Sequence, residues 1–249
     1  MNTSTRTLAP LIGLAFLTFF SCSRDKVITT EIIPSDGTKL TLNGGIGGSD
    51  AANAVYLDLS TDKQDSVKRK SWDLGFYNGA EFRVILNNQT GVAAVAAGKV
   101  ELKDVNVTSF DINQLASGYT PEKLKLYDDS AGRLAQTVIA EVKSNAQDNE
   151  VYVIHTAFAA TVEKANLWKI KILRNAEAGY TLQYAKIDDT EFQTISINKN
   201  STHNFNFFAL TAGQVNVEPA KDDWDLVWTK AMSTTAMGST QIPYIFSDL

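Results

Sequence analysis

The stretch that decides the fold is residues 167–186, LWKIKILRNAEAGYTLQYAK. Large apolar side chains at Trp168, Ile170 and Ile172 alternate with their neighbours, and the same alternation returns over residues 180–186. A period of two is typical of a strand with one buried face. Residues 174–179 between the two segments form a glycine-containing connection of hairpin length. This stretch therefore predicts an antiparallel hairpin.

The same period recurs outward from this hairpin. Residues 192–197 and 204–208 are further expected strands, and we interpret residues 198–201 between them as another connection of hairpin length. Helical spacing is weak, because the turn residues DDSAG at 128–132 interrupt the one candidate helix, residues 121–140. The sequence predicts an all-β fold, mostly antiparallel and sandwich-like with two sheets and few short helices.

One strand pattern occurs twice in the chain. Residues 56–61 (YLDLST) followed by 71–76 (SWDLGF) recur as 207–212 (FFALTA) followed by 223–228 (DWDLVW). We interpret this as one supersecondary unit used twice, with Asp73 and Asp225 pointing away from a buried stripe in each copy. The two expected stripes are Trp72, Leu74 and Phe76, and Trp224, Leu226 and Trp228. Two such units facing each other favour one domain over residues 38–249.

The chain begins with an apolar run that ends at its only cysteine, Cys22. Arg6 is the only charged residue in residues 1–21, and residues 8–20 are too few to cross a bilayer of about 30 Å as a mature helix. The pattern predicts a lipoprotein signal peptide at 1–21, acyl chains on Cys22 and a polar tether over 22–37. The membrane lipid is then a partner through Cys22, and the location is the bacterial cell envelope, at the outer membrane. The alternative is an ordinary secretory signal with an incidental cysteine.

Composition excludes several classes of function. The 249 residues carry a formal net charge of −5 without a lysine-arginine cluster, so nucleic-acid binding is not expected. With Cys22 assigned to lipid, stability rests on burial of the hydrophobic 44%. The chain holds two histidines and no Gly-x-Ser-x-Gly motif, and the glycine-rich residues 43–48 precede the next strand too closely for a dinucleotide-binding unit. We therefore do not expect an enzyme.

Several segments together resemble the HmuY-like lipoproteins. They are residues 72–76 with 82–87, residues 151–156 with 167–172, and the closing residues 218–230. The resemblance covers most of residues 50–246 and implies an all-β lipoprotein that captures haem and passes it to an outer-membrane receptor. It also implies two axial ligands, a histidine pair in one branch and methionines in others. Here the region that corresponds to the histidine ligands, roughly residues 115–150, contains neither His nor Met.

The candidate haem ligands are the histidines and methionines beyond the signal peptide, because haem iron accepts such side chains. The first, His155, shares a strand face with Val151 and Val153, from which it could enter an apolar cleft or serve as an ordinary core histidine. The second, His203, lies beside the expected turn at 198–201, where it could fold over a bound ring or add polarity to the turn.

The two methionines complete the set. Met232 and Met237 flank residues 233–236 in an expected loop, where a thioether could bind iron or fill an irregular gap. Tyrosine is also a possible ligand, but the spacing of Tyr77, Tyr119 and Tyr127 selects none of them. No other metal site is expected. The sequence thus predicts a non-catalytic envelope lipoprotein that binds haem. The alternative is a surface-assembly or glycan-binding lipoprotein that has the fold without haem ligands.

Overall fold

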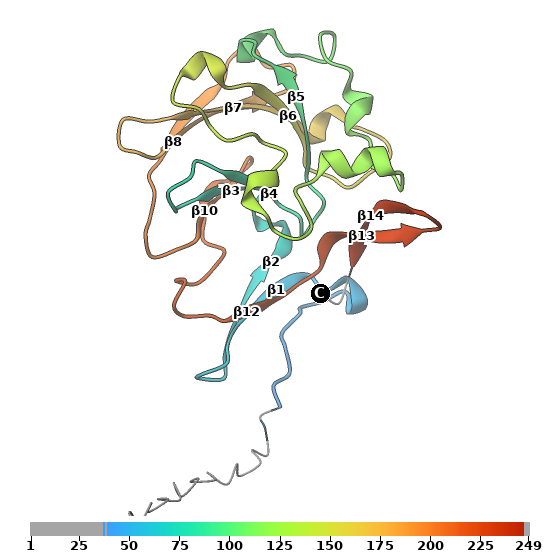
Figure 1. Cartoon of the computed structure of the whole chain (residues 1–249), viewed down its shortest axis with the longest axis vertical. Coiled ribbons are helices and arrows are strands. Elements are labelled where there is room, and N and C mark those ends of the chain that lie inside the picture. The colour runs from blue at the N-terminus through green and yellow to red at the C-terminus, as the bar shows by residue number, and fades with distance from the viewer. Residues whose placement is uncertain (1–36, 38, 247–249) are drawn as a thin grey trace, which may run out of the picture. The chain divides into compact units, whose positions relative to one another are not determined.

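The computed structural model describes residue 37 and residues 39–246 (Figure 1). The expected signal peptide, Cys22 and all of the expected tether except residue 37 lie outside these described residues. From Lys39 onward the chain forms one compact unit. Its regular structure is mostly strand, arranged in four antiparallel sheets, and the helices are short 3-10 segments. The all-β prediction is confirmed.

The hairpin predicted from residues 167–186 forms the middle of a five-stranded sheet. Its strands pair with Ile172 opposite Leu182 and Arg174 opposite Tyr180. The Asn175 side chain closes the turn, because its Oδ1 accepts the backbone N–H of Gly179 at 2.7 Å. In spatial order the strands are β5 (Ala93–Gly98), β6 (Val151–His155), β7 (Leu167–Arg174), β8 (Tyr180–Lys186) and β9 (Gln193–Ile197).

A four-stranded sheet packs against this one, and the strands of both carry the alternating apolar pattern. Its order is β11 (Gly213–Val215), β10 (Phe205–Ala209), β3 (Leu74–Tyr77) and β4 (Val84–Leu86). One core cluster contains Phe76 and Phe208 from this sheet together with Ile170 and Leu182 from the other. In Figure 1 these sheets lie one above the other, with β6, β7 and β8 over β3 and β10. The sandwich-like part of the prediction describes this pair.

The expected number of two sheets is wrong, because the structure has two further sheets. A three-stranded sheet has the order β12 (Leu226–Trp228), β1 (Asn53–Asp58) and β2 (Lys63–Lys68), and a hairpin joins β13 (Ala231–Met237) to β14 (Thr240–Phe246). The segment with Met232 and Met237 is therefore a strand rather than the expected loop. Residues 198–201 also differ from expectation, because they connect β9 and β10, which belong to different sheets.

The helices that the structure describes are all short 3-10 segments, as the weak helical spacing of the sequence predicts. Residues 121–140 hold two short 3-10 segments, separated by the turn residues that interrupt the pattern. No helix among the described residues is both long and apolar enough to cross a membrane. The 3-10 segments are η1 (Gly48–Asp50), η2 (Arg69–Ser71), η3 (Leu102–Asp104), η4 (Ile112–Leu115), η5 (Pro121–Leu126), η6 (Leu134–Gln136), η7 (Ala146–Asp148) and η8 (Lys164–Asn166).

The two copies of the repeat exchange strands. β1 of the first copy pairs with β12 of the second, and β10 of the second copy pairs with β3 of the first. The register is equivalent, with Leu57 opposite Leu226 and Phe208 opposite Leu74. Each copy thus contributes its strands to two sheets.

The predicted buried stripes hold only in part. Leu74 and Phe76 are fully buried in the core between the two large sheets, whereas Trp72 precedes β3 and packs into a separate cluster with Phe207. In the second copy Leu226 is 40% exposed, so its stripe is not a core face. The period-two argument fails here because Trp72 lies outside the regular strand.

Candidate functional site

The structure does not bring the four expected haem ligands together. His155 ends β6 and is fully buried, and its Nδ1 makes a 3.3 Å hydrogen bond with the carbonyl oxygen of Leu115. Burial lowers the pKa of its imidazole, which favours the neutral form. His155 therefore lies in the core between the five-stranded sheet and the segment that contains η4, where its Nε2 has no hydrogen-bond partner among the described residues.

His203 lies in the connection between β9 and β10. Its Nδ1 is 2.8 Å from the Oγ1 atom of Thr202 and 3.1 Å from the Nδ2 atom of Asn200. It lines a polar cavity of about 170 Å³ that Glu218 also lines. The imidazole is thus held at the surface by its own turn.

The methionines lie on the C-terminal hairpin. Met232 is buried in a core cluster, whereas Met237 is 62% exposed at the end of the same strand. Because successive side chains of a strand point to opposite faces, residues five positions apart cannot face one ligand. A cavity of about 330 Å³ lies beside Met232. It is distinct from the cavity beside His203, and neither is lined by a second member of the set.

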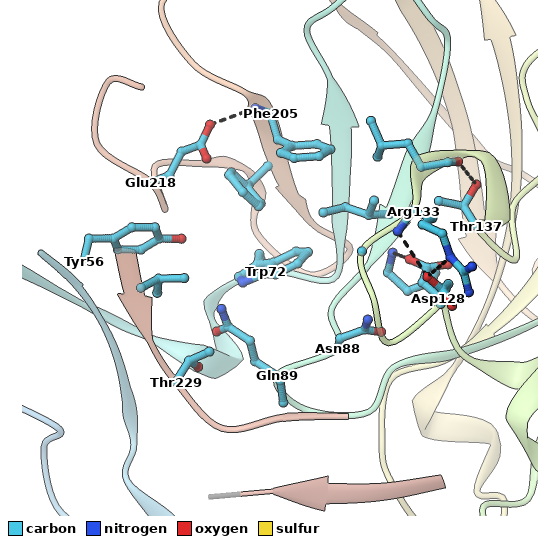
Figure 2. Close-up of a pocket in the computed structure, with 18 of the residues that line it drawn as sticks. Tyr56, Trp72, Asn88, Gln89, Asp128, Arg133, Thr137, Phe205, Glu218 and Thr229 are labelled. Carbon is cyan, nitrogen blue, oxygen red and sulfur yellow. Dashed lines mark hydrogen bonds and ion pairs between the residues drawn. The ribbon is translucent and has the colours of Figure 1, made fainter. Parts of the chain in front are cut away.

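An apolar cavity of about 320 Å³, which we call the aromatic cavity, lies where the three-stranded sheet meets the four-stranded sheet. This volume is near the lower end of the range for small-molecule pockets, about 300 to 1,000 Å³. Figure 2 shows Trp72 near the middle of the lining, with Gln89 and Asn88 below it and Phe205 above it. Five aromatic residues line the cavity: Tyr56, Trp72, Phe205, Phe207 and Trp224.

The aromatic rings of the cavity form two equivalent pairs, one from each crossing of the repeat. Trp72 meets Phe207 edge to face with ring centroids 4.8 Å apart, and Trp224 meets Tyr56 in the same way at 5.0 Å. In the aligned repeat Phe207 corresponds to Tyr56, and Trp224 corresponds to Trp72. Such edge-to-face pairs are favourable arrangements of aromatic rings. The cavity is therefore built at the junction of the two copies.

Glu218 brings a buried carboxylate to this cavity. The residue is 8% exposed, and its Oε1 accepts the backbone N–H of Phe205 at 2.8 Å. Burial raises the pKa of the Glu218 carboxyl. Burial also raises the pKa of the nearby Tyr56 phenol, and the charge of Glu218 adds to that rise. Figure 2 shows these two side chains on the same side of the cavity.

Asp128 fastens a loop at the opposite side. Its Oδ2 accepts the N–H of Leu86 at 2.7 Å, and its Oδ1 accepts the N–H of Val138 at 2.8 Å. Burial raises the pKa of Asp128 to about 6. The loop also carries Arg133, which donates two hydrogen bonds to Asp129 at 2.8 and 2.9 Å. Asp128 therefore ties the loop that covers the cavity to strand β4.

Several buried polar atoms in the lining have no hydrogen-bond partner among the described residues. They are the indole nitrogens of Trp72 and Trp224 and the side-chain oxygens of Asn88 and Gln89. Buried polar atoms of folded proteins are almost always paired, and leaving one unpaired costs about 1 to 3 kcal/mol. Four of the eight such atoms among the described residues lie in this one lining, which makes it the candidate binding site.

Sequence reasoning missed most of this site. The repeated Trp-Asp-Leu motif is the signal for the tryptophan pair, but the alternation suggests that both side chains are core. Glu218 falls within the closing segment of the resemblance and carries no local sign of burial. Asp128 belongs to the turn residues 128–132, and no sequence pattern marks Asn88 or Gln89. Only the strand exchange brings these positions to one place.

Among the residues that the structure describes, no group of three or more His, Cys, Asp or Glu side chains is arranged to hold a metal ion. The chain was also compared with protein-family models, curated proteins and solved structures. None of these comparisons gave a match.

Proposed function

We propose that this chain is a non-catalytic ligand-binding lipoprotein of the bacterial cell envelope, anchored through Cys22, whose ligand occupies the aromatic cavity between the two repeats. The observation that supports the proposal is the lining itself, which combines five aromatic residues with four buried polar atoms that lack partners. An apolar ligand would gain roughly 2.5 kcal/mol for each 100 Å² of its surface removed from water. Its polar groups would pair with the indole N–H groups or the amide oxygens.

Haem captured for transfer to an outer-membrane receptor is the ligand that the HmuY resemblance implies. The residues of the aromatic cavity do not fit it. The lining contains no histidine, methionine or cysteine, and Tyr56 is its only side chain of a type that ligates haem iron. Burial holds the Tyr56 phenol in its protonated form. Haem binding by this chain would therefore need a site elsewhere, beside His203 or Met232.

A titration tests both parts of the proposal. The mature chain, residues 22–249 with Cys22→Ser, is titrated with haemin and with metal-free protoporphyrin while the Soret band and tryptophan fluorescence are followed. A saturable one-to-one Soret shift that His203→Ala or Met232→Ala abolishes would support haem capture outside the aromatic cavity. Quenching that is saturable, equal for both porphyrins and lost in Trp72→Phe would place the macrocycle in the aromatic cavity.

A different outcome would favour the alternative function. Absorbance that rises without saturation, together with unchanged tryptophan fluorescence, would count against binding of either porphyrin. The surface-assembly or glycan-binding function would then be the better hypothesis, and a glycan array with the same chain would test it.

A further inference from the structure

The aromatic cavity has a charge pattern that selects among ligands. The carboxyl groups of its lining belong to Asp128, Asp129 and Glu218, and Arg133 is the only lysine or arginine in the lining. Arg133 is already engaged by Asp129 through an ion pair that comprises two side-chain hydrogen bonds of 2.8 and 2.9 Å. An anionic ligand would therefore meet uncompensated negative charge. A cationic ligand would meet no unpaired positive side chain in this lining.

Glu218 is the group with the most to gain from a cationic ligand. Its carboxylate is buried, and no ion pair reaches it from the basic side chains that the structure describes. The base whose charge acts on it is His203, which lines the polar cavity that Glu218 also lines but forms no ion pair with it. A buried carboxylate without a cationic partner is costly, and a cation placed beside it removes part of that cost.

The aromatic rings around Glu218 complete the pattern. Trp, Tyr and Phe rings attract a cation through their negative faces, and cages of such rings bind quaternary ammonium groups. Tyr56, Trp72 and Trp224 line the same cavity as Glu218, and Figure 2 shows Tyr56 beside it. We propose that the ligand of the aromatic cavity is an organic cation, an apolar body that carries an amine or quaternary ammonium group, with Glu218 as its counter-ion. This inference rests on the proposed ligand-binding function and names the ligand class of the same site.

A matched pair of probes tests the charge requirement. Phenyltrimethylammonium and its uncharged isostere tert-butylbenzene have nearly the same shape, and both are titrated into residues 22–249 carrying Cys22→Ser while tryptophan fluorescence is followed. We expect the cation to bind about tenfold more tightly than the isostere. The advantage should shrink as salt is added, because part of it is electrostatic.

Glu218→Gln removes the charge of the counter-ion, while its amide oxygen can still accept a backbone N–H from Phe205 or Asn204, both of which hydrogen-bond the carboxylate. We expect it to weaken binding of the cation about tenfold and to leave binding of tert-butylbenzene unchanged. The control is Glu191→Gln, which removes one exposed carboxylate outside the lining and should change neither affinity. If Glu218→Gln does not fold, the comparison of the two probes on the unsubstituted cavity still decides the question.

The outcomes separate the inference from the function on which it rests. Equal affinity for the two probes would overturn the cation proposal and leave a binding cavity for neutral ligands. Failure of both probes and of both porphyrins to bind would overturn the proposed function itself.

Discussion

Asp73 and Asp225 occupy equivalent positions in the two copies of the repeat, and each side chain accepts a backbone hydrogen bond from the other copy. The Oδ2 atom of Asp73 accepts the backbone N–H of Leu210 at 2.7 Å, and the Oδ2 atom of Asp225 accepts that of Leu59 at 2.7 Å. Their own N–H groups donate to the carbonyls of the exchanged strands, at 2.9 and 2.7 Å. The aspartates therefore lock the strand exchange that builds the aromatic cavity.

Replacing these aspartates should loosen the exchange unequally. Asp73→Ala leaves the N–H of Leu210 without its acceptor in a half-buried place, so we expect the free energy of unfolding to fall by about 1 to 3 kcal/mol. Asp225 is exposed, so Asp225→Ala should cost less, because water replaces the lost acceptor. Urea denaturation measures both. Asp73→Asn keeps an acceptor and should lie nearer the unsubstituted protein. Equal losses for the two alanine variants would contradict this account.

The buried carboxyl of Asp128 should make stability depend on pH. Its pKa is about 6 in the folded chain against an ordinary value of 3.8, so between these values the folded state binds more protons than the unfolded state. Stability should therefore fall as pH rises from about 4 to about 6, by up to about 3 kcal/mol at 1.36 kcal/mol per unit of pKa. Unfolding free energies of the unsubstituted chain and Asp128→Asn, compared from pH 3.5 to 7, measure this difference.

The Asp128→Asn comparison cancels the other titrating groups that the two proteins share. The difference between the two curves should change across pH 4 to 6 and stay constant above it. A flat difference over the whole range would mean that Asp128 titrates normally in the folded chain.

A methyl group at Gly75 should disturb the cavity through Ile85. A Cβ atom there would lie 2.7 Å from the Cγ1 atom of Ile85 and 3.4 Å from the Cε1 atom of Phe207, both of which line the cavity. Because Cγ1 is not the free end of the side chain, Gly75→Ala should cost about 1 to 3 kcal/mol and weaken probe binding. Thermal unfolding and the fluorescence titration measure the two effects. Gly118→Ala is the matched control, since its Cβ would meet only ordinary contacts at 3.7 Å and beyond.

The lipid anchor has a direct test. Full-length protein expressed in a Gram-negative bacterium should lose residues 1–21, carry acyl chains on Cys22, incorporate labelled palmitate and fractionate with the envelope membrane. Cys22→Ser should remain unlabelled and leave the membrane fraction, because the acyl chains supply the attachment. Intact mass spectrometry distinguishes the products. An unmodified thiol on an uncleaved chain would contradict the anchor.

Local pattern was sufficient for the β-sheet of this protein. The alternation in residues 167–186 specifies the hairpin and its register, because a shift of one residue would move every large side chain to the wrong side. The expectation of one buried face is wrong for β7, since Lys169 and Lys171, which alternate with its large apolar side chains, are only 1% and 9% exposed. The repeated Trp-Asp-Leu motif likewise shows that one unit is used twice. These conclusions need only neighbours along the chain.

Tertiary structure alone decided which strands pair and therefore where a ligand can bind. The local pattern does not show that β1 pairs with β12 and β10 with β3, because these partners lie far apart in the sequence. The exchange places Trp72 in one cavity with Trp224 and Glu218, which lie more than a hundred residues away in the sequence. The sequence by itself determined the strands, and the long-range pairing determined the cavity.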